Sequence, residues 1–262
     1  MKILLVFCAF FLFTNQVAAQ IAIDVYPVDG SVTIYDYKQK KWFYSDSVDA
    51  KKLTLPASTF KIPNSLIALE TGILKDENQI LKWDGIPKYF LGVKMEAWNK
   101  DTDLKSAYKN STIWFFVELA KRIKRDRYRK YLEICAYGNL NFSEKGIDFW
   151  NYGQYGISPV NQILFLRRLY EEELPFSKKH MATVKNIMIS EKTANYVIRD
   201  KTGWTRKDGL DIGWWVGYVE TKDNVYFFAT RLTKSQKDDN PNFSKYRKEI
   251  TKHVLKEMGA FD

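Results

Sequence analysis

The sequence of 262 residues has few of the residue types that most often build catalytic and metal centres. It contains two histidines, His180 and His253, and two cysteines, Cys8 and Cys135. The histidines are far apart in the sequence and no further ligands cluster around them, which argues against a histidine-based zinc site. The same scarcity leaves little room for a Ser-His-Asp triad, so a nucleophilic serine in this chain would need another base.

Long hydrophobic runs are also scarce. The apolar residues 3–13 follow Lys2 and are too few to span a membrane, and no later run is longer. Because the small residues Val17-Ala18-Ala19 come next, we expect residues 1–19 to be a secretory signal peptide, with an N-terminal membrane anchor as the alternative. Removal of the signal takes Cys8 with it and leaves Cys135 without a disulfide partner, so Cys135 is expected to pack as a small apolar residue.

The charge is basic but not concentrated. Lysine and arginine number 41 against 31 acidic residues, a formal net charge of +10. The basic residues are spread along the chain and no nucleic-acid-binding motif accompanies them, so we expect a solvated basic surface and no nucleic-acid partner. Hydrophobic residues make up 45% and aromatic ones 16%, which is typical of a folded globular protein.

The order of predicted elements indicates an α+β fold, with strands at both ends of the chain and helices between them. We expect residues 20–262 to form one domain. A central antiparallel sheet with terminal helices would use residues 20–57 plus 194–262, and an inserted all-helical lobe would use residues 58–193. A cleft is expected where the two lobes meet. Predicted strands cover residues 31–36, 42–44, 196–203, 212–219 and 225–232; predicted helices cover 58–71, 111–123, 127–136, 158–169, 177–187 and 243–258.

One short stretch, Ser58-Thr59-Phe60-Lys61, places a serine three residues before a lysine where a helical pattern begins. Residues i and i+3 lie on one face of a helix, so the Lys61 amine can reach the Ser58 hydroxyl. Lysine serves as the base of a serine nucleophile only where its surroundings keep it uncharged or modify it. The spacing alone is weak, because Ser106-Ala107-Tyr108-Lys109 shares it, and the ordinary explanation is a cap serine beside a solvated lysine.

Further motifs in a fixed order strengthen this interpretation. With them the chain resembles the class D (oxacillinase-type) serine β-lactamases over nearly all of its mature length. The resemblance implies the penicillin-recognising serine transferase fold, in agreement with the predicted sheet and helical lobe. The motifs are Pro56-Ala57-Ser58-Thr59-Phe60-Lys61-Ile62-Pro63-Asn64, Ser111-Thr112-Ile113, Tyr137-Gly138-Asn139, Phe149-Trp150, Lys201-Thr202-Gly203 and Gly213-Trp214-Trp215-Val216-Gly217.

The resemblance also implies catalytic roles. Ser58 would attack the β-lactam carbonyl and form an acyl-enzyme, with Lys61 as the base, carried as a lysine N-carboxylated reversibly by CO2. Burial would favour this modification because only a neutral amine adds CO2, and the anion formed would activate the deacylating water. Trp150 would hold the carbamate through its indole N–H, and Ser111 would pass a proton toward the leaving nitrogen. Without the resemblance, the ordinary explanation of Trp150 would be a core aromatic residue, and that of Ser111 a helix N-cap.

The same resemblance assigns the residues that bind substrate. Lys201, Thr202 and Arg247 would meet the substrate carboxylate, which suits the planar guanidinium. Gly203 would let the backbone approach the ligand closely. The oxyanion hole would consist of the nucleophile's own backbone N–H and that of Trp204.

Two of the motifs differ from the others, one in its expected role and one in its sequence. Tyr137-Gly138-Asn139 is assigned a structural role at the cleft, as a helix C-cap with glycine and asparagine in left-handed conformations. Ser111-Thr112-Ile113 more often ends in valine, and the extra methylene of Ile113 leaves the efficiency of lysine carboxylation open. The third position is not the asparagine typical of class A enzymes, which favours class D.

The resemblance implies a small-molecule β-lactam substrate, no metal and no separate cofactor beyond CO2 or bicarbonate for Lys61. We expect no membrane span, export to the bacterial periplasm, and a monomer or homodimer. Three alternatives share the fold: a cell-wall D,D-peptidase, a β-lactam sensor domain that is acylated without turnover, and a non-catalytic binding protein. The sensor is disfavoured because no transmembrane segment is predicted before residue 20. The preferred antibiotics stay open, although residues 205–211 are expected to border the cleft.

Overall fold

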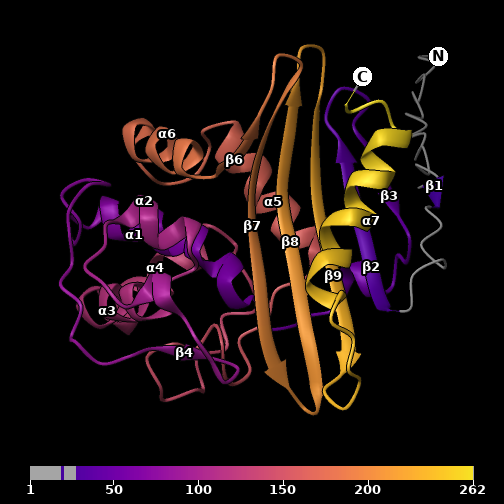
Figure 1. Cartoon of the computed structure of the whole chain (residues 1–262). Coiled ribbons are helices and arrows are strands. Elements are labelled where there is room, and N and C mark those ends of the chain that lie inside the picture. The colour runs from indigo at the N-terminus through magenta and orange to yellow at the C-terminus, as the bar shows by residue number, and fades with distance from the viewer. Residues whose placement is uncertain (1–18, 21–27, 262) are drawn as a thin grey trace, which may run out of the picture.

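The computed structural model describes residues 19–20 and 28–261, so the expected signal peptide falls, except for Ala19, outside the described residues. A seven-stranded sheet forms the centre, and a lobe of helices lies beside one edge of it (Figure 1). The strand order is β1-β3-β2-β9-β8-β7-β6, antiparallel throughout except for the β1–β3 pair. These strands are β1 (Ala19–Gln20), β2 (Asp29–Asp36), β3 (Lys41–Tyr44), β6 (Ile189–Lys192), β7 (Tyr196–Lys207), β8 (Leu210–Thr221) and β9 (Val225–Ser235).

The sheet joins the two ends of the described chain, as predicted. Strand β2 pairs with β9 along its whole length, so the N-terminal hairpin extends the C-terminal strands. Residues 212–219 of β8 form an unbroken run of apolar residues and glycines, and both faces of the strand are covered here. Trp214, Val216 and Tyr218 pack into the larger hydrophobic core, while Trp215 and Val219 point to the opposite face.

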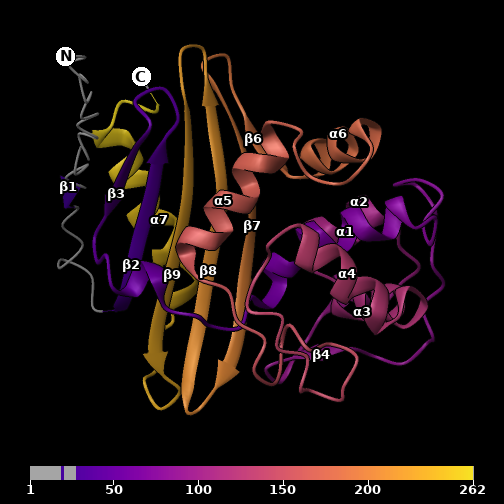
Figure 2. The ribbon, with the colours of Figure 1, turned by 180° about the vertical axis from the view of Figure 1, so that it is seen from behind.

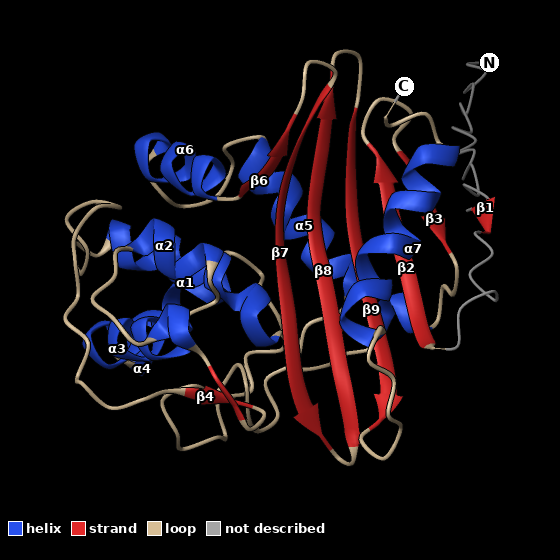
Figure 3. Cartoon of the chain, viewed as in Figure 1, coloured by secondary structure: helices blue, strands red, loops and turns tan. Residues whose placement is uncertain are grey.

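Helices cover both faces of the sheet. Figures 1 and 2 show α7 on one face and α5 on the other, and Figure 3 shows α1 to α4 gathered beside the edge formed by β7. The second core lies under α7 and includes Ile250, Val254 and Leu255, the residues that form its apolar stripe. The helices are α1 (Lys61–Glu70), α2 (Leu104–Lys109), α3 (Ile113–Ile123), α4 (Arg125–Ile134), α5 (Pro159–Tyr170), α6 (Lys178–Ile187) and α7 (Phe243–Glu257).

The predicted boundary between the lobes is wrong in two places. Strand β6 pairs with β7 in the sheet, although residues 58–193 are predicted to be helical. Its sequence, Ile-Ser-Glu-Lys, is mostly exposed and lacks the apolar alternation of a strand, because β6 is an edge strand. Helix α5 is correctly predicted as a helix, with Ser158 as its N-cap, but it contacts β2, β8 and β9.

Local chain geometry departs from the pattern at a few further points. Helix α1 begins at Lys61 rather than Ser58, because Ala57–Phe60 forms a 3-10 turn. Pro63 therefore lies in the first turn of α1, where its missing N–H costs no hydrogen bond. Residues 73–110, whose polar sequence predicts no regular element, contain α2 and a small hairpin of β4 (Tyr89–Phe90) and β5 (Val93–Lys94).

Cys135 is buried, and burial raises the pKa of its thiol to about 12. A thiol that stays protonated at neutral pH packs as a small apolar group, as expected. Within residues 19–20 and 28–261, no helix has both the length and the apolar character needed to cross a membrane.

Candidate active site

Ser58 and Lys61 meet where the helical lobe joins the sheet. Lys61 Nζ lies 2.7 Å from Ser58 Oγ, within hydrogen-bonding distance. Lys61 is only 1% exposed, whereas Ser58 is 8% exposed and lines a cavity. The pair therefore presents the hydroxyl to the cavity and keeps its potential base beneath the surface.

The surroundings of Lys61 favour the neutral amine. Burial holds the pKa of Lys61 well below its usual value, the positive charge of Lys201 lowers it further, and Asp148 opposes the shift. The Phe116 ring lies 5.0 Å from Nζ and forms part of the apolar surroundings. A neutral amine can accept the proton of Ser58 or react with CO2.

The second serine–lysine spacing is not such a site. Ser106 and Lys109 lie in α2, where the Asp103 carboxylate accepts a hydrogen bond from the Ser106 N–H at 2.7 Å and so caps the helix. Lys109 is exposed to solvent. The ordinary explanation of the motif therefore holds here, and burial distinguishes Lys61 from Lys109.

Ser111 and Lys201 form a second serine–lysine contact beside the first. Lys201 Nζ donates to Ser111 Oγ at 2.5 Å and to the Thr202 carbonyl oxygen at 3.1 Å. Burial lowers the pKa of Lys201 to about 7, Asp200 opposes this, and Arg247 adds to it. Ser111 is not an N-cap, because Thr112 takes that position in α3 and Ser111 precedes it with a φ of 53°. This left-handed conformation is uncommon for serine.

The Gly203 position of β7 lies directly against the nucleophile turn. A Cβ built on Gly203 would lie 3.1 Å from the Pro56 carbonyl oxygen and 3.3 Å from both Ala57 Cβ and Thr59 Cγ2. The carbonyl of Gly203 also accepts a hydrogen bond from Arg247 Nη1 at 2.6 Å. A side chain at this position would therefore make tight contacts that push β7 and the serine turn apart.

We therefore expect Gly203→Ala to lower kcat/KM by about 10²-fold, since β7 and the Ser58 turn must move apart and small misplacements at a reacting centre are costly. Steady-state hydrolysis of a penicillin, the substrate class that the sequence motifs imply, measures this change. Gly146→Ala is the matched control, because its Cβ would meet first the flexible end of Glu144. Equal activity of the two variants would contradict the close approach of β7.

Two adjoining cavities open at this site. The smaller has a volume of about 160 Å³ and contains Ser58 in its wall; the larger has about 570 Å³. They share Phe90, Trp98, Ile113 and Trp204, so they form one groove along β7. The other walls of the small cavity come from Met95, Asn110, Ser111, Thr202, Gly203 and Arg247. Of residues 205–211, which are expected to border the cleft, Thr205 and Arg206 line the larger cavity.

Trp150 lies beneath the nucleophile turn and is 1% exposed. Its indole stacks on Phe60, with ring centroids 5.0 Å apart and an interplanar angle of 10°. Its carbonyl oxygen accepts a hydrogen bond from the Ala57 N–H at 3.0 Å. Ala57 has a φ of 51°, so Trp150 supports a turn whose strained residue, Ala57, comes directly before Ser58.

The Tyr137-Gly138-Asn139 segment follows α4 as a structural loop. Gly138 has a φ of 75°, and Ala136 and Leu140 also have positive φ, but Asn139 does not, so the expected left-handed Asn139 is wrong. Asn139 instead uses its side chain, accepting from the Gly156 N–H at 2.9 Å and donating to the Gln154 carbonyl at 3.0 Å. None of the three residues is among those that line the two cavities in the described part of the chain.

Sequence reasoning missed two contributors to the site. Gln162 of α5 donates a hydrogen bond to Thr59 Oγ1 at 2.7 Å, which connects the turn containing Ser58 to the helix that packs on the sheet. Phe90 reaches the groove from the β4–β5 hairpin, whose turn places Leu91 and Gly92 at positive φ. For Phe90, the available turn signal was Gly92, two residues farther along the chain.

A serine with a buried lysine three residues on, placed where a helical lobe meets an antiparallel sheet, is the arrangement of the penicillin-recognising serine transferases. Residues 27–256 match the family model described as the penicillin binding protein transpeptidase domain. The predicted fold class is therefore confirmed.

Individual relatives narrow the family. The chain is 42% identical to β-lactamase OXA-2 of Salmonella typhimurium over 80% of its length and 74% of that protein. It is 40% identical to β-lactamase OXA-48 of Klebsiella pneumoniae over 87% of this chain and 83% of that protein. A solved class D β-lactamase from Sebaldella termitidis superposes with a TM-score of 0.86 at 45% identity, covering 94% of this chain and 100% of that one. The chain belongs to the class D β-lactamase family, as its motifs predict.

Proposed function

We propose that this chain hydrolyses the β-lactam amide bond of penicillin-type antibiotics through an acyl-enzyme on Ser58, and so confers resistance to them. The observation that carries the proposal is the 2.7 Å contact between Lys61 Nζ and Ser58 Oγ at the edge of a groove. The relatives named above are β-lactamases, which supports the same reaction.

In the acylation step, Ser58 Oγ attacks the β-lactam carbonyl carbon while the Lys61 side chain takes the hydroxyl proton. The C–N bond of the ring then breaks, and the leaving nitrogen receives a proton from the Ser111 hydroxyl. Lys201 Nζ, 2.5 Å from Ser111 Oγ, replaces that proton. The backbone N–H groups of Ser58 and Trp204 serve as the oxyanion hole, where one such donor is typically worth about 3–4 kcal/mol.

Lys61 is suited to N-carboxylation by CO2, because its amine is buried in apolar surroundings and its pKa lies well below the usual value. When formed, the carbamate supplies an anionic base at the end of the Lys61 side chain. We assign Trp150 to hold it through the indole N–H. In deacylation a water proton goes to the Lys61 side chain, the water oxygen bonds to the acyl carbon, and Ser58 leaves with a proton. No cofactor other than CO2 or bicarbonate is required.

Basic residues on one side of the groove support binding of the substrate carboxylate. Arg247 donates to the Gly203 carbonyl, and burial lowers its pKa only to about 10, so the guanidinium stays charged at neutral pH. Lys201 and Thr202 complete the carboxylate site. Lys201 differs from Arg247 because its pKa of about 7 means that it gains or loses its charge within the physiological pH range.

This difference predicts a pH-dependent KM. Lys201 is charged below its pKa of about 7 and neutral above it, so the KM for a penicillin should rise as the pH increases from about 6 to about 8. Added bicarbonate would carboxylate Lys61 and give it a negative charge. Because that charge favours the protonated form of Lys201, the rise in KM should shift to higher pH. Lys201→Arg stays charged and should lack the rise. A KM for the parent enzyme that is flat over this range, with or without bicarbonate, would contradict the role of Lys201.

The proposed function is tested by turnover of a chromogenic cephalosporin. We expect many product molecules for each enzyme molecule. A burst of one equivalent followed by no further product would favour the second candidate class, a D,D-peptidase or sensor domain that is acylated without turnover. The β-lactamase relatives favour turnover over that alternative.

We further propose that residues 1–19 direct export and are removed, leaving residues 20–262 as one catalytic domain in the periplasm. A small-molecule β-lactam is the only partner the reaction needs, and the active enzyme is a monomer or homodimer. Mass spectrometry of the protein from a periplasmic fraction, with a mature N-terminus at Gln20, tests the export.

A further inference from the structure

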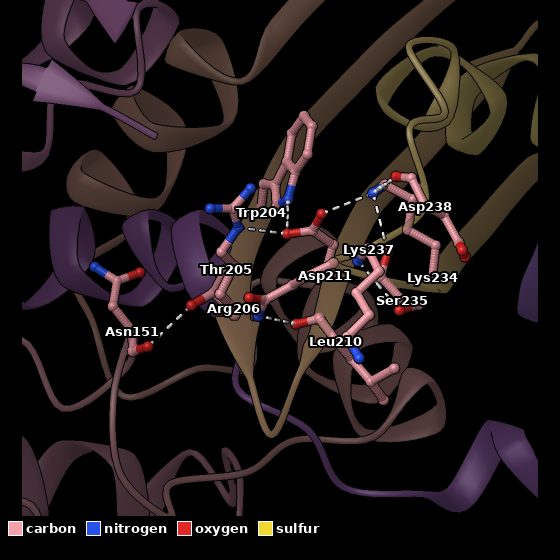
Figure 4. A network of polar contacts seen from close by, with 11 residues as sticks. Asn151, Trp204, Thr205, Arg206, Leu210, Asp211, Lys234, Ser235, Lys237 and Asp238 are labelled. Atoms are coloured by element: carbon pink, nitrogen blue, oxygen red, sulfur yellow. Dashed lines mark hydrogen bonds and ion pairs between the residues drawn. The ribbon is translucent and has the colours of Figure 1, made fainter. Parts of the chain in front are cut away.

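A buried carboxylate lies just outside the groove, at the turn between β7 and β8. Asp211 Oδ1 accepts hydrogen bonds from Trp204 Nε1 at 3.1 Å and Arg206 Nε at 2.8 Å, and its Oδ2 pairs with Lys234 Nζ at 3.0 Å (Figure 4). Asp211 is 1% exposed. Its three partners offset the cost of burying a charge, and despite burial they lower the pKa of the carboxyl, led by Arg206.

The sheet register explains why these groups converge. Asp211 pairs with Arg206 on β7 and with Lys234 on β9, so the three charges form one row across three strands. Trp204 lies two residues before Arg206 and points to the same face, diagonal to Asp211. Its direct cross-strand partner is Gly213, which has no side chain to block the indole.

The indole that Asp211 holds is also a wall of the active site. Trp204 lines both cavities of the groove. Its ring packs against Phe243 of α7 at a centroid distance of 5.5 Å and against Phe90 at 6.4 Å. Asp211 itself is not among the residues that line either cavity, so any effect on substrate must pass through Trp204 or Arg206.

We propose that Asp211 is a positioning residue that sets the side-chain specificity of the enzyme. Its carboxylate fixes the Trp204 indole between the two cavities and thereby limits the size of the substrate side chain that passes from one to the other. This inference rests on the proposed β-lactam hydrolysis for its kinetic consequence. Its structural content, a Trp204 ring held by Asp211, stands independently.

The kinetic test compares benzylpenicillin with the bulkier oxacillin. Asp211→Ala should raise the ratio of kcat/KM for oxacillin to that for benzylpenicillin by about tenfold, mostly through KM, because a released indole can move aside. Asp211→Asn, which preserves shape and one acceptor, should give a smaller change. Trp204→Phe lacks the N–H and should raise the ratio similarly, and adding Asp211→Ala to it should have little further effect.

Asp36→Asn is the matched control. Asp36 is also buried in a strand and accepts hydrogen bonds, from Gln39 N–H and Asn224 Nδ2, but it lies at the opposite end of the sheet. The Asp36→Asn substitution should leave the ratio of kcat/KM for oxacillin to that for benzylpenicillin unchanged. Thermal unfolding checks that each variant is folded. If Asp211→Ala does not fold, Asp211→Asn takes its place in the comparison.

A second readout does not depend on activity. Acrylamide should quench tryptophan fluorescence more strongly in Asp211→Ala than in the parent, and this gain should be absent in the Trp204→Phe background. Increased quenching without hydrolysis of either penicillin would reject the proposed function and keep the positioning role. An unchanged ratio and unchanged quenching in folded Asp211 variants, or fully additive effects of the two substitutions, would overturn the inference.

Discussion

Ser58→Ala should abolish covalent labelling by penicillin and lower kcat by about 10⁶-fold, the scale found when a serine nucleophile is removed from a hydrolase. Ser111 and Thr202 also line the cavity, but the buried Lys61 contacts Ser58 Oγ, whereas Ser111 Oγ accepts from Lys201, so we do not expect either hydroxyl to replace the nucleophile. The protein should stay folded, since the Ser58 hydroxyl makes its side-chain hydrogen bond to Lys61 alone among the described residues. Intact-protein mass spectrometry after incubation with penicillin measures the adduct.

Ser106→Ala is the control for this result, because Ser106 has the same spacing to a lysine but lies in α2 with an exposed partner. It should label and turn over substrate like the parent. An adduct of normal yield on the Ser58→Ala protein would show that another residue is the nucleophile.

Lys61→Met should remove turnover, lowering kcat by about 10⁴-fold, at the upper end of what a general base contributes. Methionine retains much of the lysine volume in a site where Lys61 is 1% exposed, so the loss reports on the base rather than on a cavity. Any residual acylation should persist as a stable adduct, because deacylation loses the same base. Pre-steady-state kinetics separates the two steps.

The stability of this variant should change in the opposite direction. The folded pKa of Lys61 is lowered, so below the unfolded pKa the unfolded chain binds more protons and the native state is penalised. Lys61→Met removes this penalty and should unfold at the parent temperature or higher at neutral pH. Lys109→Met is the control, with neither effect expected, because Lys109 is exposed. Normal turnover by the Lys61 variant would refute its role as the base.

Part of this site could be predicted from the sequence because it depends on local geometry. The spacing of Ser58 and Lys61 allows their contact within one helical turn, while the burial that distinguishes Lys61 from Lys109 comes from the rest of the fold. The apolar run of residues 212–219 likewise predicts a strand, and the structure shows that both of its faces are covered. The resemblance then selected Ser58 over Ser106, a choice that the spacing alone leaves open.

Other features depend on distant segments and had no local signal. Gln162 meets Thr59 only because α5 crosses the sheet, and the polar β6 is a strand only because β7 offers its edge. Asp211 is a polar residue near a glycine turn in the sequence. Only the register of three strands makes it a buried carboxylate with three partners.

The most direct test of the mechanism is turnover of a chromogenic cephalosporin in CO2-depleted buffer, followed by addition of bicarbonate. We expect one equivalent of product and then little turnover in the depleted buffer, with full turnover restored by bicarbonate, because the Lys61 side chain regains its carboxylate. The Ser58→Ala protein should stay inactive in both. Turnover of the parent enzyme that is equally fast with and without CO2 would contradict the carboxylated Lys61 as the deacylating base.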